Sequence, residues 1–449
     1  MNRCSAPLDI LIQGGRLLTL AGDNAIIEDP LIGIRDGEIL FIEEAHAPLV
    51  SLYAPKEIIN AEGCAILPGL VNTHTHVPMV CFRGLADDLP LLEWLNNHIF
   101  PAERKHVNRE MVYAGALLGI AEMLLSGTTT FCDGYFFESS VAQAALESGI
   151  RCVAGMGFLD ADIEHVTEHE IERHRQAAEN FISKWLPERQ MITPALFCHS
   201  PYTCSPQTIR VIKEVARLHA LPFLIHLAET SDEREIIKGR HGYTPVNYLE
   251  SLGVLDDKTV AVHCNWLDQT EITCLAVNRV KVSHNPQSNM KLAAGVGPIP
   301  EMIAAGIDVG LGTDGCASNN DHDMFGEMDS AAKLHKVMKK DPSIMDACTI
   351  LTMATMGGAR VLGMERLIGS VEVGKKADLI VVDLKKPHLT PVYNVCSQLV
   401  YAASGADVQT SIINGKIVMK DRRLMTIDIE EVMDNVTRIA QDIKHPAGK

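Results

Sequence analysis

The sequence predicts an α/β protein in which a (β/α)8 barrel carries a small β-sandwich domain built from both termini. Between about residues 65 and 364, short apolar runs with strand character alternate with longer helical patterns, which is typical of βα units around a parallel sheet. Before and after that region, short apolar runs are separated by turn signals. We therefore expect a β-domain segment at 1–64, the barrel at 65–364, and at 365–449 the rest of the β-domain with a terminal helix.

The two β-rich ends each contain a hairpin signal. Asp36-Gly37 separates two strand-like halves near the start, and Asn414-Gly415 separates two near the end. Such dipeptides favour the tight turns that join antiparallel strands. We expect a single β-domain assembled from both ends, and two separate β-extensions are the alternative.

The barrel prediction rests on eight apolar runs in the middle of the chain. These runs span residues 64–76, 128–134, 151–158, 191–200, 222–229, 259–265, 280–286 and 309–315. Amphipathic stretches lie between them, such as 109–127 and 205–220, and the second opens with Ser205-Pro206, a typical helix start. Eight βα units predict a closed (β/α)8 barrel.

Length, charge and cysteine usage restrict the class of protein. A chain of 449 residues can bury a large barrel and an accessory domain. The net charge of −17 argues against a nucleic acid or an anionic membrane as partner. No stretch approaches the ~20 apolar residues of a membrane-spanning helix. Twelve cysteines without a C-x-x-C pair, after a start that lacks a secretion signal, predict a reducing, cytoplasmic location.

Polar residues end most of the eight predicted strands. They are His74 and His76, His199, His226 with Glu229, His263, His284, and Asp314. The active sites of (β/α)8 barrels lie where the strands finish. One such histidine can simply cap a strand or hydrogen-bond a loop, but packing alone does not place one at most of the strands. The pattern therefore favours a metal site.

His74, His76, His226 and Asp314 form the expected ligand set. In an extended strand, His74 and His76 lie on one face because alternate side chains share a side. Three imidazoles and a carboxylate suit one divalent ion with an open position for water. Zinc is favoured on ligand grounds, although the same ligands accept iron(II), manganese(II) or nickel(II). Such an ion lowers the pKa of its bound water to roughly 7.

The remaining strand-end residues are candidates for proton movement and substrate contact. Glu229 can carry a proton from water to a leaving nitrogen, or can be a charge at a helix N-terminus. His263 is expected to hold the water and His199 to contact the substrate ring, although each alone can be structural. Asp314 can also accept a proton. For His284, substrate contact and loop scaffolding both stay open.

The motifs PGLVNTHTH, HLAE, VHC, SHNPQSNMKL and GTDGCASNN resemble those of the amidohydrolase superfamily, in the same order and over nearly the whole chain. The stretch RGLADDLPLLEWLNNHIFPAE is similar to the substrate loop of the 5′-methylthioadenosine/S-adenosylhomocysteine deaminases. The resemblance implies that Trp94 covers a nucleoside, that Glu103 accepts from the ribose hydroxyls, and that Ser318 contacts the ring. It also implies a homo-oligomer. Without it, Trp94 is better explained as a packed helix residue.

The expected reaction is hydrolytic deamination of an adenosine-type nucleoside to the inosine analogue and ammonia. Met156 occupies a segment in which relatives that accept S-adenosylhomocysteine tend to have an arginine, and methionine cannot pair with a carboxylate. Arg173 or Arg175 can substitute, or can be surface charges. We therefore expect 5′-methylthioadenosine, 5′-deoxyadenosine or adenosine in preference to S-adenosylhomocysteine.

Two other functions stay open at this level. One is an aminohydrolase or chlorohydrolase that acts on a free heterocycle, such as guanine, a pterin or a triazine, with the same metal core. The other is a catalytically silent barrel that serves as an assembly scaffold. The converging polar residues argue against the scaffold, because a scaffold does not need them.

Overall fold

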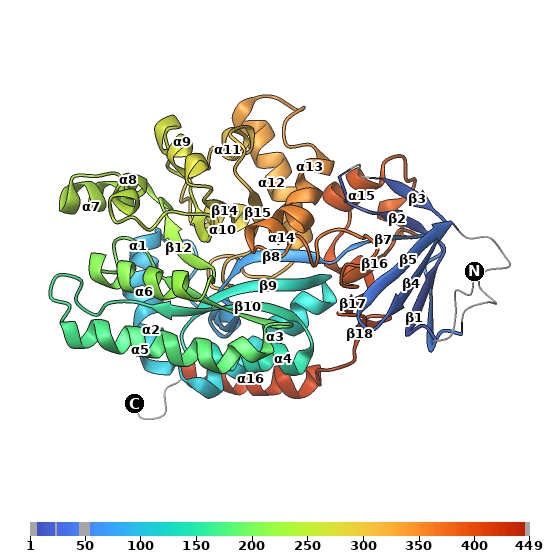
Figure 1. Ribbon diagram of the computed structural model, residues 1–449, viewed down its shortest axis with the longest axis horizontal. Coiled ribbons are helices and arrows are strands. Elements are labelled where there is room, and N and C mark those ends of the chain that lie inside the picture. The colour runs from blue at the N-terminus through green and yellow to red at the C-terminus, as the bar shows by residue number, and fades with distance from the viewer. Residues whose placement is uncertain (1–6, 23–24, 45–53, 445–449) are drawn as a thin grey trace.

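Eight parallel strands form the centre of the computed structural model, which describes residues 7–22, 25–44 and 54–444 (Figure 1). The strands follow one another around the sheet in chain order, from β8 to β15. Their bounds are β8 (Leu70–Thr75), β9 (Thr128–Tyr135), β10 (Arg151–Phe158), β11 (Ile192–Cys198), β12 (Phe223–Leu227), β13 (Thr259–His263), β14 (Lys281–His284) and β15 (Val309–Leu311). Each coincides with one of the eight apolar runs of the sequence, although β9 extends one residue past its run, to Tyr135.

Hydrogen bonds join the last strand to the first and close the barrel. The Thr73 hydroxyl donates to the carbonyl of Leu311 over 2.9 Å, and the Asp314 amide donates to the carbonyl of His74 over 3.0 Å. The predicted (β/α)8 barrel is therefore confirmed. Closure also brings the end of β15 beside the end of β8, and so brings Asp314 beside His74.

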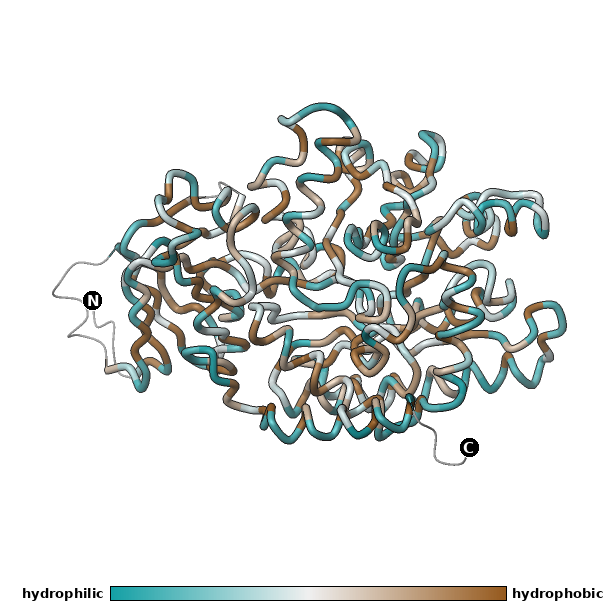
Figure 2. Tube along the Cα trace, turned by 180° about the vertical axis from the view of Figure 1, so that it is seen from behind, coloured by the Kyte–Doolittle hydropathy of each residue, from teal (hydrophilic) through white to brown (hydrophobic). Residues whose placement is uncertain are grey.

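Helices surround the barrel and bury their apolar faces on it, and the hydrophilic residues concentrate on the outer sides of these helices (Figure 2). Ser205 caps the start of α6 as expected, by accepting from the amide of Thr208. None of the described helices has the length and apolarity needed to cross a bilayer. The helices of the barrel are α3 (Arg109–Leu125), α4 (Glu138–Ser148), α5 (Glu168–Trp185), α6 (Pro206–Leu218), α7 (Ser231–His241), α8 (Pro245–Ser251), α9 (Gln269–Val277), α10 (Pro286–Lys291), α11 (Ile299–Ala304), α12 (Met324–Lys339), α13 (Ala347–Thr352) and α14 (Gly358–Val361).

Both ends of the chain contribute strands to the β-domain, on the right of Figure 1. One sheet has the order β5-β4-β1-β6, and the other has the order β19-β18-β17-β16-β7-β2-β3. The second sheet joins the two ends of the chain where β16 pairs with β7. This confirms the expectation that both ends build one β-domain. The strands are β1 (Ile10–Gln13), β2 (Arg16–Leu18), β3 (Ile26–Glu28), β4 (Pro30–Arg35), β5 (Glu38–Glu44), β6 (Glu57–Asn60), β7 (Cys64–Pro68), β16 (Leu379–Asp383), β17 (Val408–Ile413), β18 (Lys416–Lys420) and β19 (Arg423–Leu424).

The two expected hairpins are present, and their turns touch each other. Asp36-Gly37 joins β4 to β5, and Asn414-Gly415 joins β17 to β18. All four turn residues have positive φ, from 49° to 81°, as this type of two-residue turn requires. A Cβ on Gly415 would lie 2.7 Å from the Cα of Gly37, so glycine is needed there for the close approach of the two turns.

The first apolar run, residues 64–76, forms two strands rather than one. Its first half is β7, in the β-domain, and its second half is β8, in the barrel. The chain changes domain at Gly69, where a Cβ would lie 2.0 Å from the Thr129 hydroxyl. A continuous apolar run hides this junction, because both halves are buried. The division of the chain into separate folding units stays a prediction.

The terminal helix α16 (Ile429–Lys444) lies along the barrel beside α3 (Figure 1). Its buried residues Val432 and Val436 belong to the apolar cluster that includes Met111. Three short helical segments lie between β16 and β17 in the chain: η6 (Pro387–Leu389), α15 (Val395–Tyr401) and η7 (Gly405–Asp407). The end of the chain therefore returns to the barrel after completing the β-domain.

Candidate active site

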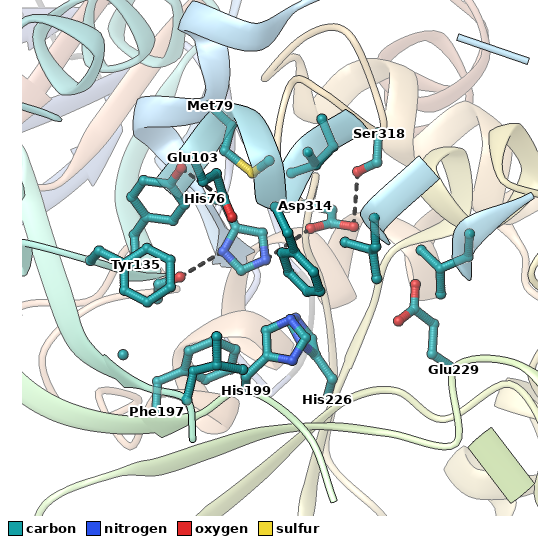
Figure 3. A pocket seen from close by; sticks show the side chains of 18 of the residues that line it. His76, Met79, Glu103, Tyr135, Phe197, His199, His226, Glu229, Asp314 and Ser318 are labelled. Atoms are coloured by element: carbon teal, nitrogen blue, oxygen red, sulfur yellow. Dashed lines mark hydrogen bonds and ion pairs between the residues drawn. The ribbon is translucent and has the colours of Figure 1, made fainter. Parts of the chain in front are cut away.

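The four expected metal ligands converge at the carboxyl ends of the barrel strands. His74 is the last residue but one of β8 and His76 directly follows that strand, His226 lies in β12, and Asp314 follows β15. The Nε2 atoms of His74 and His76 lie 3.5 Å and 3.4 Å from Asp314 Oδ1. His226 Nε2 lies 3.2 Å from His74 Nε2. Figure 3 shows His76, His226 and Asp314 pointing toward one another.

This spacing fits a bound divalent cation. Tetrahedral ligands about 2.0–2.1 Å from zinc lie about 3.3 Å from one another, close to the three distances above. His76 Nδ1 lies 2.6 Å from the carbonyl of Gly134 and donates to it, so the lone pair of His76 Nε2 faces Asp314. Two overlapping groups have ligand atoms within 4.8 Å of one another: His74 with His76 and Asp314, and His74 with His226 and His263.

Burial sets the charge states that such a site needs. Desolvation lowers the pKa of His74 to about 4 and that of His226 well below its usual value, so both imidazoles are neutral. Burial alone would raise the pKa of Asp314. A hydrogen bond from His74 and the nearby imidazoles outweigh burial and hold that pKa well below its usual value. Neutral imidazoles and an ionised carboxylate are the forms that bind a cation.

The backbone at two of the strand ends is strained. His263 has a φ of 72° and Asp314 a φ of 62°, in the left-handed region that side chains other than glycine rarely adopt. Strain of this kind persists only where the surrounding structure enforces it, and it concentrates at functional sites. Both side chains line the cavity at the strand ends.

Glu229 lies next to the ligands and is not one of them. It is only 7% exposed, and its Oε1 lies 3.8 Å from His263 Nε2. Burial and then the nearby charge of Asp314 raise its pKa to about 8, which leaves it able to gain and lose a proton near neutral pH. Glu233 fixes the backbone of this loop by accepting from the amides of Ala228 and Glu229 over 2.9 Å and 3.0 Å.

His263 has a defined orientation. Its Nδ1 lies 2.9 Å from Asn289 Oδ1 and donates to it, so Nε2 is left as an acceptor that faces Glu229. Asn289 is held in turn by its own contact with Asn265, over 2.9 Å. Desolvation lowers the pKa of His263, so the ring is neutral.

A cavity opens directly over the converging residues. Trp94, Glu103, His199, Glu229 and Ser318 all line it. The other lining residues are largely apolar: Met79, Leu91, Leu95, Ile99, Phe100, Tyr135, Phe136, Phe158, Leu159, Phe197 and Leu292. A flat apolar ligand with a few polar groups therefore suits the cavity.

Trp94 and Glu103 reach the same cavity because the helix that carries them contains a π turn. The helix runs without a break through α1 (Leu91–Trp94), η3 (Leu95–Ile99) and α2 (Phe100–His106), and η3 is the π turn. In a regular α-helix, residues nine positions apart lie about 2.5 turns apart, on opposite faces. The wider π turn changes this phase and brings both side chains toward the cavity.

Glu103 and its neighbour Tyr135 form a polar spot in the apolar wall. The Tyr135 hydroxyl donates to Glu103 Oε1 over 2.6 Å, and Figure 3 shows both side chains beside His76. Glu103 is 8% exposed, and burial raises its pKa. Its second carboxylate oxygen is left to accept from a ligand.

The structure also places the three weaker candidates. His199 lines the cavity, and its Nδ1 lies 2.8 Å from the Thr203 hydroxyl. Ser318 lines the cavity but donates to Asp314 Oδ2 over 3.1 Å. His284 is absent from the residues that line the cavity. It is fully buried, and its Nε2 lies 3.0 Å from His335 Nε2. These surroundings favour a scaffolding role for His284 over substrate contact.

Sequence reasoning missed several residues that hold the site in place. Ser288 donates to Asp314 Oδ2 over 2.6 Å, and with Asn289 it lies on α10, within the motif SHNPQSNMKL. Glu233 sits one helical turn after Glu229. The proline that starts α10 signals a helix at that strand end, but the direction of Ser288 and Asn289 depends on the barrel.

The barrel is closed and parallel, and imidazoles and a carboxylate converge at its strand ends beside a buried glutamate. This combination defines the class of barrel hydrolases with a metal centre. The model of the amidohydrolase family matches residues 65–418. The chain belongs to the amidohydrolase family.

Several named proteins are similar to this chain over nearly its whole length. A 5-methylthioadenosine/S-adenosylhomocysteine deaminase of Syntrophobacter fumaroxidans is 48% identical over 440 residues, which cover 98% of this chain and 99% of that protein. A 5′-deoxyadenosine deaminase of Methanothermobacter thermautotrophicus is 45% identical over 92% of this chain and 96% of that protein. The crystal structure of an adenosine deaminase from Xanthomonas campestris with bound zinc has a TM-score of 0.93 at 35% identity, and covers 98% of this chain and 100% of that one.

Proposed function

We propose that this protein is a metal-dependent aminohydrolase that converts an adenosine-type nucleoside to its inosine analogue and releases ammonia. The observation that carries the proposal is the convergence of His74, His76, His226 and Asp314 beside the buried Glu229, at the floor of an apolar cavity. The three named relatives, all deaminases of adenosine-type nucleosides, support the same substrate class.

The side chains at the cavity floor have separate roles. A divalent cation held by the four ligands supplies Lewis acidity, which makes water a nucleophile near neutral pH. His263 accepts a hydrogen bond from this water through Nε2 and orients it toward carbon 6 of the adenine ring. Glu229 takes a proton from the water and delivers it to the leaving amino nitrogen. Asp314, an ionised acceptor beside the same water, can take the second proton and pass it on to N1 of the ring, which carries it in the inosine analogue.

The cavity wall recognises the nucleoside. Glu103 accepts from the ribose hydroxyls through the carboxylate oxygen that Tyr135 leaves available. Trp94 supplies a broad apolar surface against the purine, and it is 6% exposed in the cavity wall. His199 contacts the ring from the opposite side of the cavity, with Ser318 as a weaker contact. Exclusion of water around these groups strengthens each polar contact.

The 5′ substituent of the nucleoside faces an outer cleft that continues from the inner cavity. The two share Phe100, Glu103, Tyr135, Phe136, Gly157 and Leu159. Met156 lines the outer cleft, whereas neither Arg173 nor Arg175 does. We therefore favour uncharged 5′ groups, as in 5′-methylthioadenosine or 5′-deoxyadenosine. S-adenosylhomocysteine is a necessary comparison, because Arg104, Arg109 and Lys184 also line this cleft.

An assay of ammonia release from the purified, zinc-loaded protein tests the function. The substrates are 5′-methylthioadenosine, 5′-deoxyadenosine, adenosine and S-adenosylhomocysteine, with guanine and a triazine alongside. We expect turnover of the adenosine-type nucleosides and little or none of the last two. Turnover of guanine or the triazine alone would contradict the proposal.

Glu103→Ala separates the proposal from the alternative of a free heterocycle. If Glu103 binds the ribose, the unmodified protein acts on adenosine far faster than on adenine, and the variant loses this preference, mainly through a higher KM. Glu93→Ala, on the same helix but outside the residues that line the cavity, is the matched control. Equal rates on adenosine and adenine in the unmodified protein would favour the alternative.

Three further expectations belong to this proposal. Zinc is the ion that we favour, and metal analysis of the purified protein tests it against iron, manganese and nickel. All the described cysteines are free thiols, which supports a cytoplasmic location. A homo-oligomer stays a prediction, which the mass of the particle in solution tests.

A further inference from the structure

Two buried carboxyl groups lie behind the active site without a basic partner among the described residues. Asp133 lies near the end of the fully buried strand β9, and Glu138 begins α4 five residues later. They are 0% and 2% exposed. Asp133 Oδ2 and both oxygens of Glu138 lack a hydrogen-bond donor when both groups are ionised. Unpaired buried charges of this kind are costly, so the arrangement requires an explanation.

Asp133 is connected to the expected metal ligand His76 from both sides. Its Oδ1 accepts from the Thr75 hydroxyl and from the Val77 amide, each over 2.6 Å. The next residue, Gly134, accepts from His76 Nδ1 over 2.6 Å through its carbonyl. The end of β9 therefore holds the residue before His76, the residue after it, and the imidazole itself.

Thr75 and Val77 occupy Asp133 Oδ1, so Oδ2 is the oxygen that is left for Glu138. A hydrogen bond between the two side chains lowers the pKa of Asp133 and raises that of Glu138, so the two carboxyl groups are neighbours. A hydrogen bond between two carboxyl groups requires that one of them keeps its proton. Asp133 already accepts from two donors, which favours its ionised form. Glu138 is faced by the amide of Tyr135 and otherwise by Asp133. The proton therefore belongs on Glu138.

We propose that Glu138 is a positioning residue that keeps its proton at neutral pH and donates it in a hydrogen bond to Asp133, and that this pair fixes His76 for metal binding. The pair lies outside the proposed catalytic groups and metal ligands, although Glu138 also lines the outer cleft. Burial raises the pKa of Glu138 well above its usual value and that of Asp133 only to about 6, which agrees with this placement of the proton. The inference rests on the metal site of the proposed function, but not on the substrate.

Zinc affinity of the full chain tests the proposal. The protein is stripped of metal with a chelator and titrated with Zn²⁺ against a coloured zinc chelator of known affinity. Glu138→Gln keeps a donor toward Asp133 and should bind zinc within about threefold of the unmodified protein, whereas Glu138→Leu should bind about 10–100-fold more weakly. Asp133→Asn should weaken binding similarly, because its amide cannot accept on both sides.

Asp378→Asn is the matched control, because Asp378 is an equally buried carboxylate that pairs with Arg151. Its loss should lower the thermal midpoint without changing zinc affinity. A Glu138→Leu protein that binds zinc as tightly as this control would overturn the positioning role. Tighter binding and a higher thermal midpoint in both Glu138→Gln and Asp133→Asn would show instead that two ionised carboxylates repel each other.

Infrared difference spectra at pH 7.5 give a second measurement, which also applies if Glu138→Leu fails to fold. The carbonyl stretch of a protonated carboxyl group should be lost in Glu138→Gln and kept in Asp133→Asn. No difference band in Glu138→Gln would mean that Glu138 is ionised, and would overturn the proposal. Neither measurement involves a nucleoside, so a failure here is distinct from a failure of the proposed function.

Discussion

At the scale of single residues, the cavity floor combines side chains whose charge states suit a bound cation with one, Glu229, whose charge state suits proton transfer. His74, His226 and Asp314 have charge states suited to metal binding. Burial lowers the pKa of the two histidines, and a hydrogen bond from His74 together with the nearby imidazoles outweighs burial and lowers that of Asp314. Glu229 lies a few ångströms away, and burial shifts its pKa upward, to about 8. Opposite shifts in neighbouring groups are typical of an active site in which one group transfers protons.

Glu229→Gln should therefore lower kcat by about 10²- to 10⁴-fold, because glutamine keeps the size of the side chain but cannot accept a proton. The measurement is ammonia release by the zinc-loaded variant, with metal content determined on the same sample. The metal content should not change. Glu235→Gln, at an exposed position on the same helix α7, is the control and should retain full activity. An unchanged rate in Glu229→Gln would remove the proton-transfer role.

Removal of metal should lower the thermal midpoint. A ligand that binds only the native state at 1,000 times its Kd stabilises it by about 4 kcal/mol. We expect the midpoint to fall on chelation and to return on addition of zinc, as measured by differential scanning fluorimetry. His226→Ala should show a much smaller response to zinc, whereas the exposed His169→Ala should respond fully. Equal responses in the two variants would show that zinc acts elsewhere.

At the scale of secondary structure elements, irregular segments bring side chains to positions that regular elements would not reach. The π turn η3 lets Trp94 and Glu103 face one cavity. At the other side of the barrel, α12 places His335 against His284 at the end of β14, with a distance of 3.0 Å between their Nε2 atoms. One ring must donate to the other, so the accepting ring is neutral, and burial lowers the pKa of both rings, which keeps the donor neutral as well.

The His284–His335 contact should make the protein less stable in mild acid. Burial lowers the pKa of His335 to about 4, whereas the ordinary value is 6.5. Between these pH values the unfolded chain binds a proton that the native chain does not. The free energy of unfolding therefore falls as the pH falls from 6.5 toward 4, by about 3 kcal/mol from this group.

His335→Gln tests this dependence, because glutamine can still hydrogen-bond to His284 but does not titrate. Chemical denaturation at pH 7.0, 6.0 and 5.0 should give a shallower loss of stability in the variant than in the unmodified protein. The exposed His169→Gln is the control, and it should lose stability as the unmodified protein does. Parallel pH profiles in all three proteins would rule out the contribution of His335.

At the scale of the whole molecule, the β-domain is attached to the barrel by a buried ion pair. Arg151 at the start of β10 binds Asp378 just before β16 through two hydrogen bonds of 2.8 Å and 3.1 Å. Both side chains are almost fully buried, and Asp378 also accepts from the amide of Asn414 over 2.7 Å. This cluster joins the first residue of a barrel strand to both the sheet and the hairpin of the β-domain.

Arg151→Met should lower the free energy of unfolding by about 3–5 kcal/mol, because it leaves Asp378 buried without its partner. The double variant Arg151→Met with Asp378→Asn should recover part of this loss, since no unpaired charge then remains. Urea denaturation followed by far-ultraviolet circular dichroism measures both. Arg175→Met, which removes a half-exposed surface pair with Glu214, should cost at most about 1 kcal/mol. A similar small cost for Arg151→Met would show that the junction is not held by this pair.

Much of the architecture could be predicted from local patterns. Alternation of apolar runs with amphipathic stretches predicted the eight barrel strands, and Asp36-Gly37 and Asn414-Gly415 predicted the two hairpins. The (β/α)8 fold and the amidohydrolase resemblance are both confirmed. The pattern did not reveal the domain junction at Gly69, because the strands on both sides of it are equally buried.

The sequence by itself determined the residue types at the strand ends. Because parallel strands of a barrel end at one face, it also led to the expectation that four residues meet there: His74, His76, His226 and Asp314. Only the tertiary structure decided which groups hold them there. These supporting contacts depend on the directions of side chains at the strand ends of the closed barrel. They are the contact of Ser288 with Asp314, that of Asn289 with His263, and the Asp133–Glu138 pair behind His76. Local periodicity sets the face on which a residue lies, whereas its partner is set by barrel closure, which joins segments far apart in the chain.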